Sequence, residues 1–220
     1  MIITCGGQKG GSGKSCLAQN LAVALAKAGK PVMLIDADTQ KTSSDWAEER
    51  ARTDALEIEH QAMSGDISKT VWTLAGTGRY LVIDCGGRDT KELRAAMIAS
   101  DLLLVPVRPK RRDLKTLDYV SDLVEKSRIA NKYLVARSVV TQAPTLPSQV
   151  QRILDAKAVC DSFGLPALEP VIFTRNVYDD AEEAGLSVFE ANDQKAKEEI
   201  QQVRDAVLAI GETFFEDKGE

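Results

Sequence analysis

The sequence MIITCGGQKGGSGKS, residues 1–15, is the stretch that decides the fold of this chain. Ile2–Cys5 is a short apolar strand, and Gly7–Ser15 follows the phosphate-loop pattern GxxxxGK followed by Ser or Thr. Apolar residues then recur at helical spacing, from Leu17 to Leu25. Glycines let backbone N–H groups turn toward phosphates, and the N-terminus of the next helix adds partial positive charge. This order of elements therefore predicts nucleotide binding.

Individual roles follow from the position of each residue in the loop. Lys14 is expected to reach the β- and γ-phosphates of ATP, and the Ser15 hydroxyl is expected to ligate Mg²⁺. Two residues at a later strand end, Thr141 and Gln142, are placed by sheet topology near the adenine. The predicted nucleotide-binding residues are Lys9, Gly10, Gly11, Ser12, Gly13, Lys14, Ser15, Cys16, Thr141 and Gln142.

Beyond the loop, apolar runs alternate with helical patterns along the whole chain. Strands are predicted at Ile2–Cys5, 32–35, 56–60, 80–83, 102–107, 133–140 and 171–173. Helices are predicted from about residue 14 to 29, and at 46–52, 67–74, 93–99, 114–126, 150–160 and 194–214. Strands without polar alternation are buried on both faces, and repeated β-α units form parallel sheets. We expect one α/β domain over residues 1–220, with a mostly parallel twisted sheet and helices on both faces.

Composition narrows the class of protein. The 220 residues are 44% hydrophobic and 28% charged, as in ordinary globular proteins, and the net charge is −5. A DNA contact would therefore need a local basic patch or a dimer, because the chain as a whole is acidic. No apolar run reaches the ~18 residues of a membrane span, and the N-terminus lacks the features of a signal peptide. We expect a cytoplasmic protein.

A second lysine makes the loop more specific. Lys9-Gly10-Gly11-Ser12-Gly13-Lys14-Ser15 resembles the deviant Walker A motif, KGGxGK followed by Ser or Thr, of the ParA/MinD family of P-loop ATPases. The resemblance implies that Lys9 reaches across a dimer interface to the partner subunit's nucleotide. A second cation per site lowers the free-energy cost of burying a triphosphate.

Two further segments are similar to the same family. Met33–Gln40 resembles switch I, with Thr39 in place of the usual proline, and Leu81–Gly87 resembles Walker B running into switch II. By this resemblance the catalytic residues are Lys9, Lys14 and Asp38, with Asp38 positioning the attacking water. The Mg²⁺ site is formed by Ser15, Asp36 and Asp84, and the latter acts through water.

Shorter matches favour small, ParF-like partition ATPases: Ser100–Val107, Val177–Tyr178 and Gly185–Glu190. They imply a DNA-partitioning ATPase for a plasmid or chromosome, hydrolysing ATP slowly unless stimulated. ATP would drive formation of a sandwich homodimer that binds DNA non-specifically on the nucleoid, and a centromere-binding ParB-type partner would reset it. Two alternatives stay open, a nucleotide-gated scaffold that positions another cargo and a metabolic ATP-dependent enzyme. The choice between dimer and filament also stays open.

The two ends of the sequence help to distinguish this chain from larger ParA proteins and from MinD proteins. The first strand begins at Ile2, so we expect no N-terminal DNA-binding domain of the kind that larger ParA proteins carry. MinD proteins attach to membranes through a basic amphipathic C-terminal helix. The acidic end of this chain, residues 214–220, would be repelled by anionic lipid, so we expect no membrane partner.

Basic residues after the fifth strand are the main candidates for DNA contact. Arg108 and the run Lys110–Arg112 come directly after Val107. They could form a DNA patch, contact phosphates or the partner subunit, or simply begin a solvated helix. Arg175 is a second candidate, although acidic residues surround it in sequence. The DNA-binding candidates are Lys110, Arg111, Arg112 and Arg175, and their contacts would be salt-sensitive and independent of DNA sequence.

Overall fold

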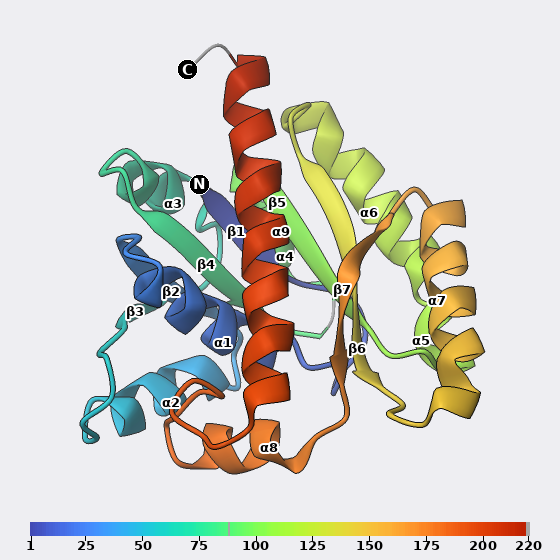
Figure 1. Cartoon of the computed structure of the whole chain (residues 1–220). Coiled ribbons are helices and arrows are strands. Elements are labelled where there is room, and N and C mark those ends of the chain that lie inside the picture. Colours follow the sequence, from blue (N-terminus) through green and yellow to red (C-terminus); the bar gives the residue numbers. More distant parts are fainter. Residues whose placement is uncertain (88, 219–220) are drawn as a thin grey trace.

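A computed structural model of the chain describes residues 1–87 and 89–218, with side chains up to residue 214. Its centre is a seven-stranded sheet in the order β3-β2-β4-β1-β5-β6-β7, and every pair of neighbouring strands is parallel (Figure 1). The strands are β1 (Ile2–Cys5), β2 (Val32–Ala37), β3 (Glu59–Ala62), β4 (Tyr80–Cys85), β5 (Leu102–Val107), β6 (Val135–Ala143) and β7 (Ala167–Phe173).

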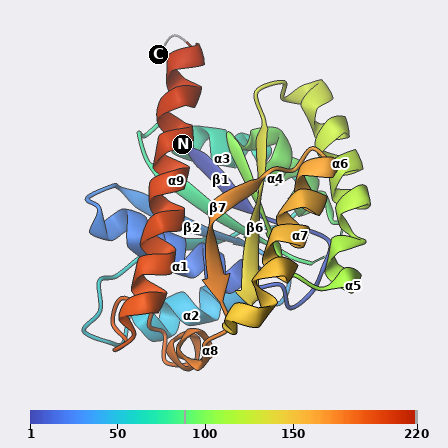
Figure 2. The same ribbon diagram turned by 45° about the vertical axis from the view of Figure 1, so that its right-hand side comes forward.

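Helices connect the strands and cover both faces of the sheet. They are α1 (Lys14–Lys27), α2 (Thr42–Arg50), α3 (Ser68–Ala75), α4 (Lys91–Ala99), α5 (Arg111–Leu114), α6 (Leu117–Ala130), α7 (Val150–Ser162), α8 (Asn176–Glu183) and α9 (Gln194–Lys218), with a 3₁₀ turn at Pro147–Gln149. In Figures 1 and 2, α1 and the long α9 lie together on one face, while α4 and α6 lie on the other.

The sheet is apolar on both faces, which is why it needs two helical layers. On β4, Leu81 and Ile83 pack among side chains of α3, α4 and α6, whereas Val82 packs among those of α1 and α9. All three are fully buried. Each face therefore withdraws its own set of apolar side chains from water, the main stabilising contribution in a parallel α/β domain.

The predicted fold class is confirmed, with the sheet wholly rather than mostly parallel. Strands Ile2–Cys5 and Leu102–Val107 were predicted with their observed bounds. The strand predicted at 56–60 begins three residues later and ends two residues later, at Glu59–Ala62. This strand is at the edge of the sheet and most of its residues are exposed, so its sequence has no apolar pattern to mark its ends.

Two helices differ from the prediction. The predicted helix over 114–126 is divided into the short α5 and the longer α6. Helix α8 was missed, because only Tyr178 and Ala181 are buried in a segment that is otherwise mostly polar. Its place matters, since α8 forms one wall of the pocket described below.

Strand register places the acidic residues. Asp36 on β2 lies directly beside Asp84 on β4, and Asp84 lies beside Cys5 on β1, the residue before the glycine-rich loop. Carboxyl ends of parallel strands share one edge of the sheet, so both aspartates lie next to the phosphate loop.

No described helix has the length and apolar character that a membrane-spanning segment needs. The prediction drawn from the acidic residues 215–220 lies outside the described side chains.

Candidate nucleotide site

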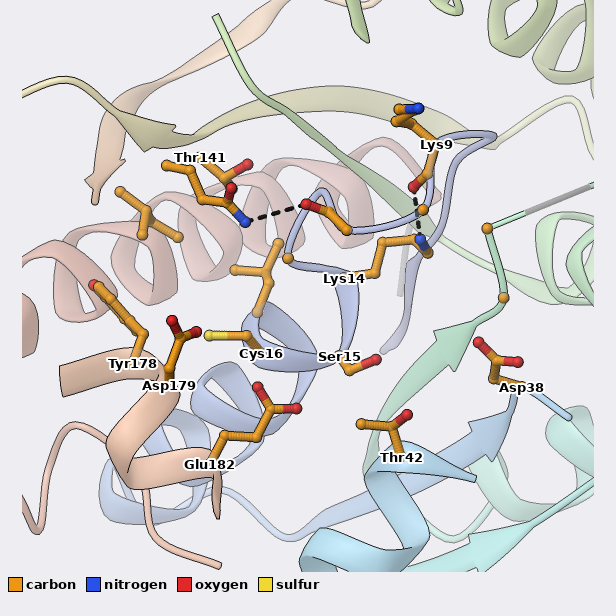
Figure 3. Close-up of a pocket in the computed structure, with 18 of the residues that line it drawn as sticks. Lys9, Lys14, Ser15, Cys16, Asp38, Thr42, Thr141, Tyr178, Asp179 and Glu182 are labelled. Carbon is orange, nitrogen blue, oxygen red and sulfur yellow. Dashed lines mark hydrogen bonds between the residues drawn. The ribbon is translucent and has the colours of Figure 1, made fainter. Parts of the chain in front are cut away.

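A pocket of about 1030 Å³ lies at the carboxyl edge of the sheet. Its walls come from the glycine-rich loop, the segment after β2, the segment after β4, the end of β6 and the β7–α8 connection. Figure 3 shows two ends of this pocket: Lys14, Ser15, Asp38 and Thr42 lie at one, and the acidic and aromatic side chains of α8 lie at the other.

The loop has the backbone that phosphate binding needs. Gly11 and Gly13 have φ values of 68° and 86°, in the left-handed region that favours glycine. Gly13 is the N-cap of α1, with no side-chain cap and no acidic residue in the first turn. The first N–H groups of the helix therefore remain available, beside the positive end of the helix dipole, for an anion.

Residues of β6 brace the loop from the side. Thr141 Oγ1 donates a 2.8 Å hydrogen bond to the carbonyl oxygen of Ser12, and Gln142 Nε2 donates a 3.2 Å bond to that of Gly11. These bonds turn two loop carbonyls toward β6. Thr141 and Gln142 thus line the pocket, and their contacts in this structure are with the loop itself. Their place beside an adenine stays a prediction.

The two lysines of the loop point in different directions. Lys14 is only 7% exposed, and its Nζ donates a 2.9 Å hydrogen bond to the carbonyl oxygen of Lys9. Burial lowers the pKa of Lys14, while the nearby Asp84 and Asp38 carboxylates oppose that shift. The Lys9 side chain extends away from Lys14 (Figure 3). One lysine thus faces the phosphate end of its own pocket, and the other is directed elsewhere.

Asp84 is the most deeply buried acid of the site. It is fully buried, and Ser43 Oγ donates a 2.7 Å hydrogen bond to its Oδ2. Burial raises the pKa of Asp84 to about 7, against hydrogen bonds from Ser43 and Ser15 that lower it. Its Oδ1 has no hydrogen-bond partner among the described residues. An unsatisfied buried carboxylate oxygen is costly, so a cation or a water bound to a cation would stabilise this position.

Asp36 organises the segment that resembles switch I. Its Oδ1 accepts the N–H of Asp38 at 3.0 Å, and its Oδ2 accepts the N–H of Ser44 at 2.7 Å. Asp38 Oδ1 in turn accepts the N–H of Gln40 at 3.0 Å. Asp36 therefore shapes the turn that presents Asp38 to the pocket.

The segment that resembles switch II packs tightly on both neighbours. A Cβ on Gly86 would lie 3.2 Å from the Asp38 carboxylate. A Cβ on Gly87 would lie 3.1 Å from the backbone N of Gly10 and 3.1 Å from Lys14 Nζ. A side chain at either position would crowd its neighbour, so Gly86 lets the end of β4 approach Asp38, and Gly87 lets it approach the glycine-rich loop.

The donor set suits Mg²⁺ held together with a nucleotide. No cluster of three His, Cys, Asp or Glu side chains with metal-site geometry occurs within residues 1–87 and 89–214. Mg²⁺ commonly takes one or two protein oxygens and completes its shell with water and substrate phosphates. Ser15 and Asp84 supply hard oxygen atoms of that kind at the phosphate end, which fits the predicted metal set, with Asp36 beside them.

At the other end of the pocket, Cys16 was among the predicted residues, but the side chains of α8 were not. Cys16, Tyr178, Asp179 and Glu182 lie together there (Figure 3). Burial raises the pKa of the Cys16 thiol and also that of Glu182, which accepts a 3.4 Å hydrogen bond from Gln19. The repeating polar pattern of α8 gave no signal that this helix would face a pocket.

The predicted DNA-binding residues have different surroundings. Lys110, Arg111 and Arg112 are exposed. Arg175 instead forms two hydrogen bonds with Glu199 Oε1, at 2.9 and 2.7 Å, while Glu199 Oε2 accepts from the Tyr178 hydroxyl. The Arg175 charge is therefore largely neutralised by Glu199. Among the described side chains, none forms an ion pair with residues 110–112, so this run can bind an anion.

Sequence reasoning also missed the residues that hold α2 in place. Ser43 was not assigned, although it contacts Asp84, and Arg50 is 1% exposed and paired with Glu190 at 3.1 Å. The pair joins residues 140 positions apart, and a separation of that size leaves no local pattern in the sequence.

Two curated proteins are similar to this chain over most of their length. The chain is 27% identical over 208 residues to the maintenance of carboxysome distribution protein A of Halothiobacillus neapolitanus, covering 91% of this chain and 93% of that protein. It is 25% identical over 177 residues to a protein ParA of Rhizobium radiobacter, covering 80% of each.

Two solved structures share the fold with TM-scores of 0.76. One is the MinD cell division protein of Aquifex aeolicus, 21% identical, covering 94% of this chain and 96% of that one. The other is the cobyrinic acid a,c-diamide synthase of Mycobacterium smegmatis with an ATP analogue and magnesium, 18% identical and covering 94% of both chains. That neighbour holds the two cofactors predicted for this chain, and at 18% identity the likeness shows a shared fold.

The family model for the CobQ/CobB/MinD/ParA nucleotide binding domain matches residues 3–188, which include the loop, both aspartate-bearing strands and α8. A match over most of the chain, together with the geometry of the glycine-rich loop, establishes the family. The chain belongs to the CobQ/CobB/MinD/ParA family of nucleotide-binding domains.

Proposed function

We propose that this chain, over residues 1–220, is a slow ATPase that partitions DNA by cycling between an ATP-bound homodimer and separated subunits. The observation that carries the proposal is the divergence of the two loop lysines: Lys14 is turned into its own pocket, and Lys9 extends away from it. A lysine so directed is free to meet the phosphates of a second subunit. A buried triphosphate at such an interface gains from every additional cation.

In the proposed cycle, ATP and Mg²⁺ bind with the phosphates on the loop. Lys14 and Ser15 hold the phosphates and the metal, and Asp84 supports the metal through water. Asp38 orients the attacking water, because it lies at the phosphate end and is held there by the turn around Asp36. Water-orienting groups of this kind allow slow hydrolysis, and a partner protein can accelerate it by a further 10³–10⁵ in comparable enzymes.

The proposed dimer binds DNA non-specifically through Lys110, Arg111 and Arg112, which are exposed at the carboxyl edge of β5. Arg175 contributes less in this proposal, since Glu199 already neutralises it. A centromere-binding partner of the ParB type would stimulate hydrolysis and return the subunits to the separated state. The similarity to a protein ParA supports this cargo.

A second candidate is a nucleotide-gated scaffold that positions a different cargo. The observation in its favour is the 27% identity to a carboxysome distribution protein over nearly the full length of both chains. The pocket and the dimer would be the same in both candidates. The two candidates would differ in the partner protein that links the dimer to its cargo. The metabolic-enzyme alternative has the support of fold similarity to cobyrinic acid a,c-diamide synthase at 18% identity.

The test is sizing and DNA co-sedimentation with ADP, ATP and a non-hydrolysable ATP analogue, over a salt series. We expect ATP-dependent dimers whose DNA binding falls steeply with salt and is independent of DNA sequence. Lys110→Glu combined with Arg112→Glu should abolish DNA binding, and Lys69→Glu on the exposed surface of α3 is the control. Dimers that do not bind DNA would favour the scaffold that positions another cargo. An absence of nucleotide-dependent assembly would favour a metabolic enzyme.

Three variants separate the roles within the cycle. Lys14→Ala should abolish ATP binding, while Lys9→Ala should retain binding and lose ATP-dependent dimerisation. Asp38→Ala should dimerise with ATP but not turn it over, as measured by phosphate release. Rapid turnover by Asp38→Ala would remove that residue from its proposed role.

A further inference from the structure

A groove of about 380 Å³ lies between α5 and α7, outside the nucleotide pocket. We propose that it is the docking site for an acidic segment of a partner protein, anchored by one large apolar side chain. The apolar lining is Pro109, Leu114, Val159 and Phe163, and the charged residues of the groove are Arg111, Lys115, Arg152 and Asp155.

The floor of the groove is suited to an apolar anchor. Val159 and Phe163 follow each other by four residues at the end of α7, so they share the flank of the helix that faces α5. Leu114 closes the floor from α5, and all three are only half-buried. A volume of about 380 Å³, at the small end of the range for binding pockets, is large enough for one large side chain. Inserting that side chain would withdraw apolar surface from water on both partners.

The rim sets the charge of the occupant. Arg111, Lys115 and Arg152 form no ion pair with any side chain up to residue 214 that the structure describes. Arg152 donates one hydrogen bond to Gln149, and Asp155 accepts one from Gln151. Three cations thus face one carboxylate, on a chain whose net charge is −5. Carboxylates flanking the anchor would complement this rim and speed association.

The apolar floor favours a peptide over a nucleic acid. DNA binding through phosphates requires cations and polar donors, and it makes no use of a cavity lined by leucine, valine and phenylalanine. The exposed Lys110 and Arg112, on the same short stretch but outside the groove lining, suit that role better. An interface with an apolar centre and a charged rim is instead the usual anatomy of protein–protein contact.

The wall formed by α5 is held in a fixed position. Arg108, just before the groove, forms two hydrogen bonds with the buried Asp113 of α5, at 2.5 and 3.1 Å. The same guanidinium lies beside the phosphate loop, since its Nη1 would be 4.0 Å from a Cβ on Gly11. The groove is therefore preformed without nucleotide, and its occupation can be measured independently of the proposed ATPase cycle.

The experiment is fluorescence anisotropy of the full chain, without nucleotide, with three short labelled peptides. The first has one tryptophan flanked by glutamates, the second has lysines in place of the glutamates, and the third has serine in place of the tryptophan. We expect saturable binding of the first peptide alone, weakening with salt.

Charge reversal on the rim locates the site. Lys115→Glu combined with Arg152→Glu should weaken binding of the acidic peptide by about tenfold or more, because two attractions become repulsions. Lys69→Glu, an exposed lysine on α3, is the matched control and should bind as the unaltered chain does. Circular dichroism confirms that each variant is folded, which the exposed or rim position of all three residues favours.

Four results would overturn the proposal. They are equal binding of the lysine peptide, equal binding of the serine peptide, unchanged affinity in the double variant, and no binding of any peptide. If the double variant instead loses DNA binding, or changes the sedimentation of the chain alone, the groove serves a nucleic acid or a second copy of this chain.

Discussion

Replacing Arg50 tests whether a single buried ion pair holds α2 in place. The Arg50 guanidinium forms hydrogen bonds with both carboxylate oxygens of Glu190, at 3.3 and 3.1 Å. It also donates to the carbonyl oxygens of Leu56, at 2.7 Å, and Gly185, at 3.3 Å. The guanidinium carbon lies 5.2 Å from the centre of the Trp46 ring. One side chain thereby joins α2 to the loop before α9.

Arg50→Met removes the charge and keeps most of the aliphatic volume. Breaking a buried ion pair by removing one partner costs about 3–5 kcal/mol of unfolding free energy. The loss should lie at the lower end, about 3 kcal/mol, because Glu190 is 17% exposed and keeps contacts with Ser187 and Lys27. For a chain of this size, the melting temperature should fall by about 6–12 °C.

The assay is urea and thermal unfolding of Arg50→Met, Glu190→Gln and the double variant. A coupling energy of about 1 kcal/mol or more is expected between the two positions. Arg52→Met is the matched control, since Arg52 is 66% exposed and pairs only with Glu49 on the surface. Its effect should stay within about 0.5 kcal/mol. If Arg50→Met is no less stable than Arg52→Met, or if the coupling is zero, the proposed clamp does not exist.

The same pair should make stability depend on pH in one direction. Burial would raise the pKa of Glu190, but hydrogen bonds from Arg50 and Ser187 outweigh burial and lower it to about 2. A carboxylate with a depressed pKa contributes fully above its unfolded pKa of about 4.3, and this contribution is lost as pH falls toward 2. Between pH 5 and 3, Arg50→Met should therefore lose less stability than the unaltered chain.

Three further substitutions test the site and its supports. Gly87→Ala should weaken ATP affinity by about tenfold or more in a binding titration, because its Cβ would press on Gly10, while Gly76→Ala should have little effect. Ser43→Ala should lower the unfolding free energy by about 1–3 kcal/mol and weaken Mg²⁺-dependent ATP binding, since the buried Asp84 loses a hydrogen bond; unchanged values in both assays would contradict the role given to Ser43. Glu199→Gln should cost about 3 kcal/mol in urea unfolding, as the Arg175 guanidinium would lose its carboxylate, and a cost near zero would show that water replaces that carboxylate.

The sequence was sufficient for the parts of the fold that rest on local pattern. Leu102–Val107 was found with its observed bounds because it is a continuous apolar run between Asp101 and Arg108. Ile2–Cys5 was found because it leads directly into the glycine-rich loop. The phosphate loop was found for a related reason. Phosphate binding by such a loop depends on glycine torsions and on a lysine at fixed spacing. Both features lie within a few consecutive residues, so the sequence alone reveals them.

The remainder depends on contacts between distant parts of the chain. Helix α8 has few apolar residues, and it is set against the pocket by Tyr178, whose hydroxyl donates to Glu199 of α9 at 2.9 Å. The place of Ser43 beside Asp84 depends on the turn that Asp36 shapes, so no spacing rule would find it. The positions of α8 and Ser43 therefore depend on tertiary contacts and not on local secondary-structure propensity.

In the functions proposed above, nucleotide chemistry and partner choice use different parts of this chain, and Arg108 lies between them. Lys14, Ser15 and the two buried aspartates need only the carboxyl edge of the sheet, and solved folds with unrelated roles share that edge. What distinguishes this chain must therefore lie outside the pocket, on surfaces such as the α5–α7 groove and the exposed cations beside it. Arg108 contacts α5 through Asp113 and lies beside Gly11 of the phosphate loop. A movement of that loop on binding phosphate would be passed to α5, and through it to whatever partner the groove holds.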